Sequence, residues 1–150
     1  MSHLEDRVSI MKDQEGLIRA LCDMGFRKNQ IEVHQTPQRI NGYHEEDEKV
    51  GHVIIRRNNT GISSDIGWER NKDGNYIAHV DAYHYCCTTT HYDDTWQRRL
   101  TVKYNYEVSK MALDAQGISY TESKNSAGET EIEAEIEDTA EQSTKIMNYA

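Results

Sequence analysis

The stretch Asp65–Tyr76, DIGWERNKDGNY, carries the strongest local fold signal in the chain. Its first half predicts a strand, because Ile66 and Trp68 alternate with other residues and so share one face. The NKDG segment at 71–74 predicts a hairpin turn, since Asp and Gly tolerate the positive φ angles of tight turns. A returning strand is predicted over 75–85. The fold therefore contains an antiparallel hairpin.

Outside the hairpin, apolar spacing predicts two helices and further strands. A helix is expected near 14–24, and a longer one is capped by Asp93 or Asp94 and ends at Gly117. The apolar stripe of the long helix is Trp96, Leu100, Tyr104, Val108, Met111, Ala112 and Ala115. Strands are predicted over 2–11, 30–35, 50–57, 65–70, 75–85, 118–123 and 129–137, and a loop over 36–49.

The order of these elements, β-α-β-β-β-β-α-β-β, predicts an α+β fold in which an antiparallel sheet has both helices on one face. Each helix ends in a Gly and an apolar residue and precedes two strands, which suggests a pseudo-repeat of two halves. With 150 residues, we expect a single α+β domain over 1–137 and an acidic C-terminal tail over 138–150. The tail has no core signal, so a mobile segment or a short terminal helix is expected there.

The charge balance bears on the class of partner. The net charge is −9, and an acidic protein repels phosphate, so no nucleic acid is expected as a partner. No apolar run approaches the roughly 20 residues that a membrane helix needs, so no membrane association is expected. The opening residues lack an apolar signal core, and the odd number of cysteines indicates reduced thiols and a cytoplasmic protein.

The densest group of metal-competent side chains lies between residues 79 and 91. Its spacing matches no closed zinc pattern, so ordinary strand and loop polar residues are the favoured interpretation. A metal-binding protein or metal-dependent enzyme is the alternative, and the sequence indicates no particular cofactor. The metal candidates are His79, His84, Cys87 and His91.

A nucleophilic cysteine is disfavoured in the same segment. Cys87 has His84 and His91 near it in sequence, but Asp93 and Asp94 follow directly and oppose a thiolate. No glycine-rich phosphate loop is present either. The sequence therefore favours a non-enzymatic role.

Arginine and aromatic residues carry the leading functional hypothesis. Arg98, Arg99 and Lys103 form a basic cluster early in the long helix. Arginine with aromatic rings binds anionic or planar ligands and is common in protein interfaces, although pairing with the abundant acids explains any single arginine. We expect a binding or accessory protein for a small anionic ligand or a protein partner. Its candidate ligand-binding residues are Trp68, Arg70, His79, Asp81, Tyr83, Arg99 and Tyr104.

The last predicted strand supports a third hypothesis. Glu131, Glu133, Glu135 and Glu137 share one face, which is typical of a solvated sheet surface. The same acidic strand and the tail would suit a structural or assembly subunit that docks on a basic partner. The nine tyrosines make a homo-oligomer a further expectation.

Four stretches together resemble a known family. They are MSH at 1–3, LCDMGF at 21–26, DIGWERNKDGNY at 65–76, and a fourth that starts near Trp96 and includes KYNYEVSKMALDAQGISY and SAGETEIEAEIE. In this order they resemble the plastid and cyanobacterial family called hypothetical chloroplast reading frame thirty-five.

The resemblance implies a fold and supplies no activity that could be transferred. The acidic loop near 44–49, the segment 84–95 and the tail differ from the family pattern, as expected of a divergent member. A plastid-encoded protein would reside in the stroma, and a viral one in the host cytoplasm.

Overall fold

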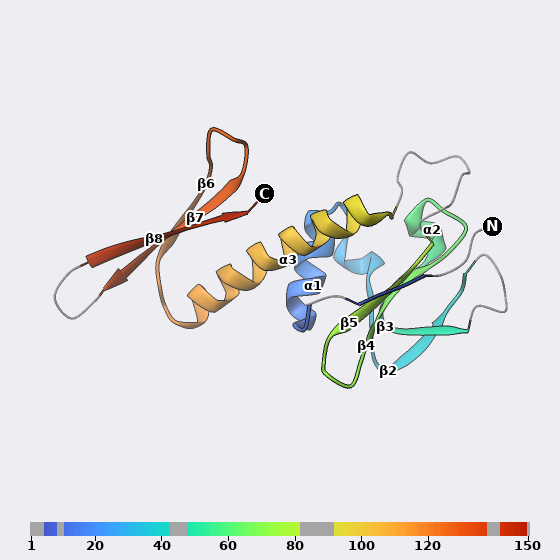
Figure 1. Cartoon of the computed structure of the whole chain (residues 1–150). Coiled ribbons are helices and arrows are strands. Elements are labelled where there is room, and N and C mark those ends of the chain that lie inside the picture. Colours follow the sequence, from blue (N-terminus) through green and yellow to red (C-terminus); the bar gives the residue numbers. More distant parts are fainter. Residues whose placement is uncertain (1–4, 9–10, 43–47, 82–91, 138–141, 150) are drawn as a thin grey trace.

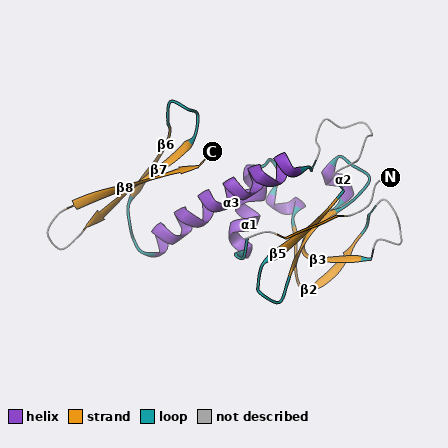
Figure 2. Cartoon of the chain, viewed as in Figure 1, coloured by secondary structure: helices purple, strands orange, loops and turns teal. Residues whose placement is uncertain are grey.

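The computed structural model describes residues 5–8, 11–42, 48–81, 92–137 and 142–149 (Figure 1). Two antiparallel sheets lie at opposite ends of one long helix, as Figure 2 shows by element type. The elements are β1 (Glu5–Val8), α1 (Gln14–Asp23), the 3-10 turn η1 (Lys28–Gln30), β2 (Glu32–Ile40), β3 (Lys49–Ile55), α2 (Arg57–Thr60), β4 (Ile66–Arg70), β5 (Tyr76–Val80), α3 (Asp94–Ala115), β6 (Tyr120–Lys124), β7 (Thr130–Glu137) and β8 (Gln142–Tyr149).

The α+β class and the antiparallel pairing are confirmed, but the strands divide into two sheets. The main sheet has the order β1-β5-β4-β3-β2, and the C-terminal sheet has the order β6-β7-β8. The sequence pattern predicts one sheet that contains all the strands. The division arises because α3 is long enough to carry the last strands away from the main sheet (Figure 1).

Two segments predicted to lack strands contain them. Residues 142–149 form β8, which pairs with β7 along its length from Thr130↔Tyr149 to Glu137↔Gln142, where a tail or short helix was expected. β2 runs on to Ile40 through the predicted loop and past Pro37, with a register irregularity between Val33 and Gln38. Proline is tolerated here because β2 is an edge strand. The domain boundary at 137 and the pseudo-repeat stay predictions.

The two helices predicted from the sequence, α1 and α3, begin at predicted caps. The Asp13 carboxylate accepts a hydrogen bond from the Gly16 amide at 2.7 Å, and the Asp93 carboxylate accepts one from the Trp96 amide at 3.0 Å. Each helix then stops at a left-handed glycine, Gly25 with φ 111° and Gly117 with φ 69°.

The two helices pack side by side on one face of the main sheet. A Cβ atom on Gly16 would lie 2.6 Å from Cγ2 of Val108, so only glycine allows α1 this close to α3. The buried cluster between the helices and the sheet holds side chains from both layers. Its largest members include Leu17, Leu21, Ile55, Ile66, Trp68, Tyr76 and Leu100.

The glycine of the DIGW motif serves the opposite face of the main sheet. Ile40 is fully buried there against Ile54, and its side chain lies over Gly67. A Cβ on Gly67 would approach Cδ1 of Ile40 to 2.4 Å. Asp65 of the same motif is also buried, and its carboxylate accepts hydrogen bonds from the amides of Asn41 and Arg57. The motif therefore ties the start of β4 to the end of β2 and to the start of α2.

The stripe predicted on α3 is buried only in its first half. Trp96, Leu100 and Tyr104 are buried, whereas Ala112 and Ala115 are exposed. The second half of α3 extends past the main sheet and carries the C-terminal sheet instead (Figure 1).

Ile132 and Ala134 of β7 are fully buried on the inner face of the C-terminal sheet. The alternation predicted for this strand is thus confirmed at these positions. None of the helices among the described residues is both long and apolar enough to cross a membrane.

Candidate functional site

A hollow of about 510 Å³ lies where the two packed helices meet the C-terminal sheet. We call it the charged hollow. Six of its lining residues carry a carboxylate or an ammonium group. The residues that line it are Asp23 from α1, Lys103, Tyr106, Glu107 and Lys110 from α3, and Glu122, Ser123, Lys124 and Thr130 from β6 and β7.

Helical spacing places the α3 residues of this site. Lys103, Glu107 and Lys110 are separated by four and three positions and so follow one face of the helix. Asp23 is the last residue of α1, and the close packing at Gly16 brings that helix end toward the same face. The opening strand of the C-terminal sheet then supplies Glu122 from the other side.

Lys110 is the central cation of the hollow. Its Nζ lies 3.2 Å from Oε1 of Glu107 and 3.0 Å from Oε1 of Glu122, so it joins α3 to β6. The same ammonium lies 4.3 Å from the centroid of the Tyr106 ring. Burial opposes the charge, but hydrogen bonds to the two carboxylates outweigh it and raise the pKa of Lys110 above its ordinary value. Lys110 therefore stays charged across the whole range of physiological pH.

Tyr106 and Glu122 form the second contact between α3 and β6. The Tyr106 hydroxyl donates a hydrogen bond to the Glu122 carboxylate. Burial and this hydrogen bond raise the pKa of Tyr106 to about 12, while the bonds from Tyr106 and Lys110 lower the pKa of Glu122. Glu122 is accordingly a fixed negative charge in the wall of the hollow.

Asp23 and Glu107 form a carboxyl pair across the two helices. Glu107 is 6% exposed, and its side chain is hydrogen-bonded to that of Asp23. Partial burial of the Asp23 carboxyl, this hydrogen bond and the charge of Glu107 raise the pKa of Asp23 to about 6. The Asp23 carboxyl therefore keeps its proton to a higher pH than an isolated aspartate does.

Lys103 and Lys124 complete the lining. Within the described part of the chain, neither ammonium forms a salt bridge, although Lys103 is close enough to Asp23 to lower its pKa. These two cations are therefore available to a ligand that enters the hollow.

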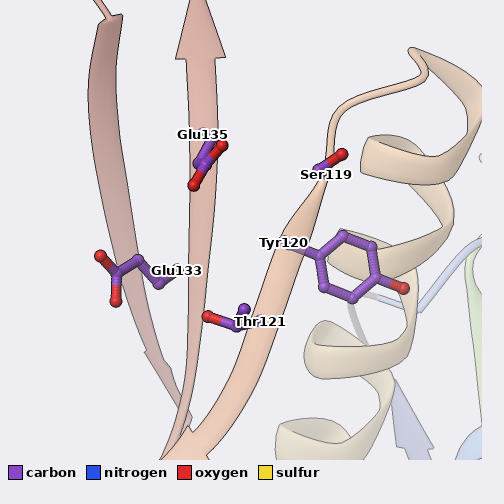
Figure 3. Close-up of a pocket in the computed structure, with 5 residues that line it drawn as sticks. All are labelled: Ser119, Tyr120, Thr121, Glu133 and Glu135. Carbon is purple, nitrogen blue, oxygen red and sulfur yellow. The ribbon is translucent and has the colours of Figure 1, made fainter.

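Two further hollows have different chemistry. One of about 320 Å³ lies on the C-terminal sheet (Figure 3), where the Tyr120 ring extends toward the helix and the Glu133 side chain extends the other way. Glutamates make it unsuited to an anion. The other, of about 340 Å³, has an aromatic wall that includes Phe26, Tyr92 and Trp96.

The structure does not bring the predicted ligand-binding residues onto one surface. Trp68 is fully buried and faces the helices, whereas His79 lies one register position away on the opposite face and is 2% exposed. The His79 ring contacts Oε1 of Glu69 at 3.0 Å. Asp81 is 1% exposed.

Three other predicted residues have distinct surroundings. The Tyr104 hydroxyl accepts hydrogen bonds from the amides of Lys12 and Asp13 and so supports the start of α1. Arg70 lies over the Tyr76 ring and donates to its hydroxyl at 2.7 Å. Arg99 is exposed on α3, one helical turn before Lys103.

The remaining candidates lie outside the described residues, namely Tyr83 and the metal candidates His84, Cys87 and His91. Within the described ranges, no group of three or more His, Cys, Asp or Glu side chains could hold a metal ion. The metal hypothesis thus stays a prediction about a segment that the structure does not describe.

Sequence reasoning missed most of the charged hollow. It identified Lys103 as part of a basic cluster, but not Asp23, Glu107, Lys110, Glu122 or Lys124. The spacing of Lys103, Glu107 and Lys110 was the available signal, because it places three charges on one helix face.

Comparison with known proteins places the chain in a family. The sequence model described as Protein of unknown function (DUF1257) matches residues 20–132, which is more than half of the chain. The match includes α1 residues from Ala20 onward, all of α3 and β6, and the first residues of β7, so every residue of the charged hollow lies within it. No curated protein and no solved structure matches the chain.

Proposed function

The chain belongs to the family of proteins of unknown function DUF1257, and we propose that it is a non-enzymatic binding protein whose charged hollow takes a small anionic ligand. The closer likeness to hypothetical chloroplast reading frame thirty-five is part of this proposal and adds no activity to it.

The observation that carries the proposal is the convergence of three lysines on one hollow. Lys110 is held in place by Glu107 and Glu122, while Lys103 and Lys124 have no salt bridge among the residues described. Ammonium groups donate charge-assisted hydrogen bonds to carboxylate, sulfate or phosphate oxygens. An anion between Lys103 and Lys124 would gain such bonds without breaking an existing ion pair.

The Arg/Tyr surface expected from the sequence is replaced here by a Lys/Tyr one. Trp68 is buried in the core, and Tyr104 is buried with its hydroxyl bonded to the amides at the start of α1. Arg99 lies one turn from Lys103 on α3 and would guide an anion toward the hollow through its long-range charge.

Native mass spectrometry of gently purified protein, followed by calorimetric titration with sulfate, tests this proposal. We expect Lys103→Ala and Lys124→Ala each to weaken sulfate binding by about tenfold to a hundredfold, since a hydrogen bond to a charged group contributes roughly 1.5–3 kcal/mol. Lys72→Ala is the matched control, because Lys72 is exposed in the β4–β5 turn of the main sheet. Equal binding by all three variants would reject the hollow as the site.

A second candidate function is docking on a basic protein partner through the outer face of the C-terminal sheet. Glu133 and Glu135 are exposed there, and Ile146, the register partner of Glu133, is 57% exposed. Acidic groups around an exposed apolar side chain suit a basic partner with one apolar contact. Ile146→Ser with unchanged partner recovery and an unchanged oligomeric state would remove this candidate.

A further inference from the structure

The charges of the hollow balance when every carboxyl group is ionised. Lys103, Lys110 and Lys124 supply three positive charges, and Asp23, Glu107 and Glu122 supply three negative ones. A balanced site attracts an anion weakly, because the carboxylates cancel the field of the lysines at distances larger than the spacing of these charges. One proton on a carboxyl group would leave the hollow with a net positive charge.

The Asp23–Glu107 pair is the place where that proton would reside. An ionised carboxylate is only an acceptor, so two carboxyl groups can hydrogen-bond to each other only when one of them is protonated. Asp23 of α1 and Glu107 of α3 line the same hollow with their side chains in contact, and Glu107 is buried at its end of the pair. Glu122 does not compete for the proton, since Tyr106 and Lys110 both donate to it.

Resting on the proposed function, we propose that the hollow takes up its anion together with one proton, which the Asp23 carboxyl holds against Glu107. The anion would thus be bound as a proton-coupled ligand, and acidification would tighten its binding.

The groups that face the pair agree with this assignment. Lys103 and Lys110 of α3 lower the pKa of Asp23, but burial and Glu107 outweigh them and leave it at about 6. Glu122 and Lys124 face the pair from β6. On α1, the Cys22 thiol lies close enough to Asp23 and Glu107 to interact with their charges. Glu15 and Lys28 also act on this thiol. An anion beside Lys103 would offset that lysine and raise the pKa of the pair further.

The direction of the pH dependence follows. Below about pH 6 the pair already holds its proton, and the anion binds most tightly. As the pH rises through 6, the free protein loses this proton, and binding of the anion must take it up again. The apparent affinity therefore falls with rising pH until the pH exceeds the pKa of the pair in the complex. Three histidines, His34, His52 and His79, lie in the main sheet on β2, β3 and β5.

Sulfate is a suitable probe because the dianion itself does not titrate near neutral pH. The full chain is titrated with sulfate by calorimetry from about pH 5.5 to about pH 7.5, in buffers with different ionisation enthalpies. We expect binding to weaken by about threefold to tenfold over this range, with the uptake of up to one proton per sulfate near pH 7. Asp23→Asn should bind sulfate with little pH dependence, and Asp114→Asn, an exposed change elsewhere on α3, should retain the dependence of the unaltered chain.

The two levels of the hypothesis fail in different ways. Absence of sulfate binding at every pH would reject the proposed function and this inference with it. Sulfate binding that is independent of pH, or a pH dependence that survives in Asp23→Asn, would reject the coupling and leave the anion site standing. Carboxyl ¹³C NMR of the unaltered chain gives a second readout: sulfate should raise the pKa of Asp23, and an unchanged value would overturn the coupling.

Discussion

The two sheets of this protein are held in different ways. The main sheet has both helices on one face, and its core buries side chains from α1, α3 and the central strands, Leu17 and Trp68 among them. The C-terminal sheet packs against the projecting half of α3, and among its described side chains Ile132 and Ala134 are fully buried. The first unit is stabilised mainly by apolar burial, whereas polar contacts carry much of the second.

The difference explains where the charged hollow lies. Between the two units, Tyr106, Lys110 and Glu122 connect α3 to β6. The Tyr149 hydroxyl of β8 also donates a hydrogen bond to Ser109 of α3. A boundary of this kind tolerates half-buried charges, because water still reaches them and no apolar packing is lost. The same charges would be costly inside the main core.

Leu17→Ala should have the largest effect. The Leu17 side chain is fully buried between the helices and the main sheet, so its removal leaves a cavity. We expect the free energy of unfolding to fall by about 3–5 kcal/mol, measured by urea denaturation. Leu113→Ala, on the projecting half of α3 and only partly buried, is the control and should cost less than about 1 kcal/mol. Similar losses in both variants would mean that the projecting half is packed as tightly as the core.

Ile132→Ala should separate the two units. Ile132 is fully buried under the C-terminal sheet, and its removal should cost about 2–4 kcal/mol, confined to that sheet. Hydrogen exchange should then accelerate in the amides of β6, β7 and β8, while those of β3, β4 and β5 keep their protection as an internal reference. Uniform acceleration in both sheets would show that they unfold as one cooperative unit.

Sequence reasoning succeeded where local rules decide the structure. The caps at Asp13 and Asp93, the NKDG turn and the alternation of β7 depend on nearest neighbours, and all were predicted. The placement of two helices on one face of the sheet followed from the order of the elements.

Sequence reasoning failed where contacts between residues far apart in the chain decide the structure. Nothing local in DIGW shows that Gly67 makes room for Ile40, or that Gly16 brings α1 to α3. The Asp23–Glu107 contact depends on that approach, so a charge pair 84 positions apart could not be inferred from periodicity. β8 was missed because its side chains have little apolar content and its order comes from pairing with β7.

Tyr104→Phe tests the role of a tyrosine that the sequence predicted to bind a ligand. The hydroxyl accepts from the amides of Lys12 at 2.9 Å and of Asp13 at 2.8 Å, and phenylalanine would keep the ring but leave both donors without this acceptor. We expect a loss of about 1–3 kcal/mol in the free energy of unfolding. Tyr120→Phe is the control, since its hydroxyl makes one long, exposed contact to Asp114, and it should be nearly neutral. Full stability of Tyr104→Phe together with loss of sulfate binding would instead restore Tyr104 as a ligand residue.

Asp23→Asn should have the smallest effect and the most informative one, because its sign depends on pH. The pKa of Asp23 is about 6 in the folded protein, above its ordinary value of 3.8, so the folded chain holds the proton more tightly than the unfolded chain. Its contribution to stability is therefore fully present below about pH 4 and is lost as the pH rises to 6. Above that range the ionised pair is a repulsion between α1 and α3, and asparagine removes it. Because Asp23 is largely exposed, we expect a gain of only about 0.5–1 kcal/mol at pH near 7.5 and none near 4, from urea denaturation at both values. A loss of stability at the higher pH would mean that the attraction of Lys103 and Lys110 for the ionised Asp23 carboxylate outweighs the repulsion from Glu107. The charges of the hollow would then stabilise the boundary between the two units at neutral pH.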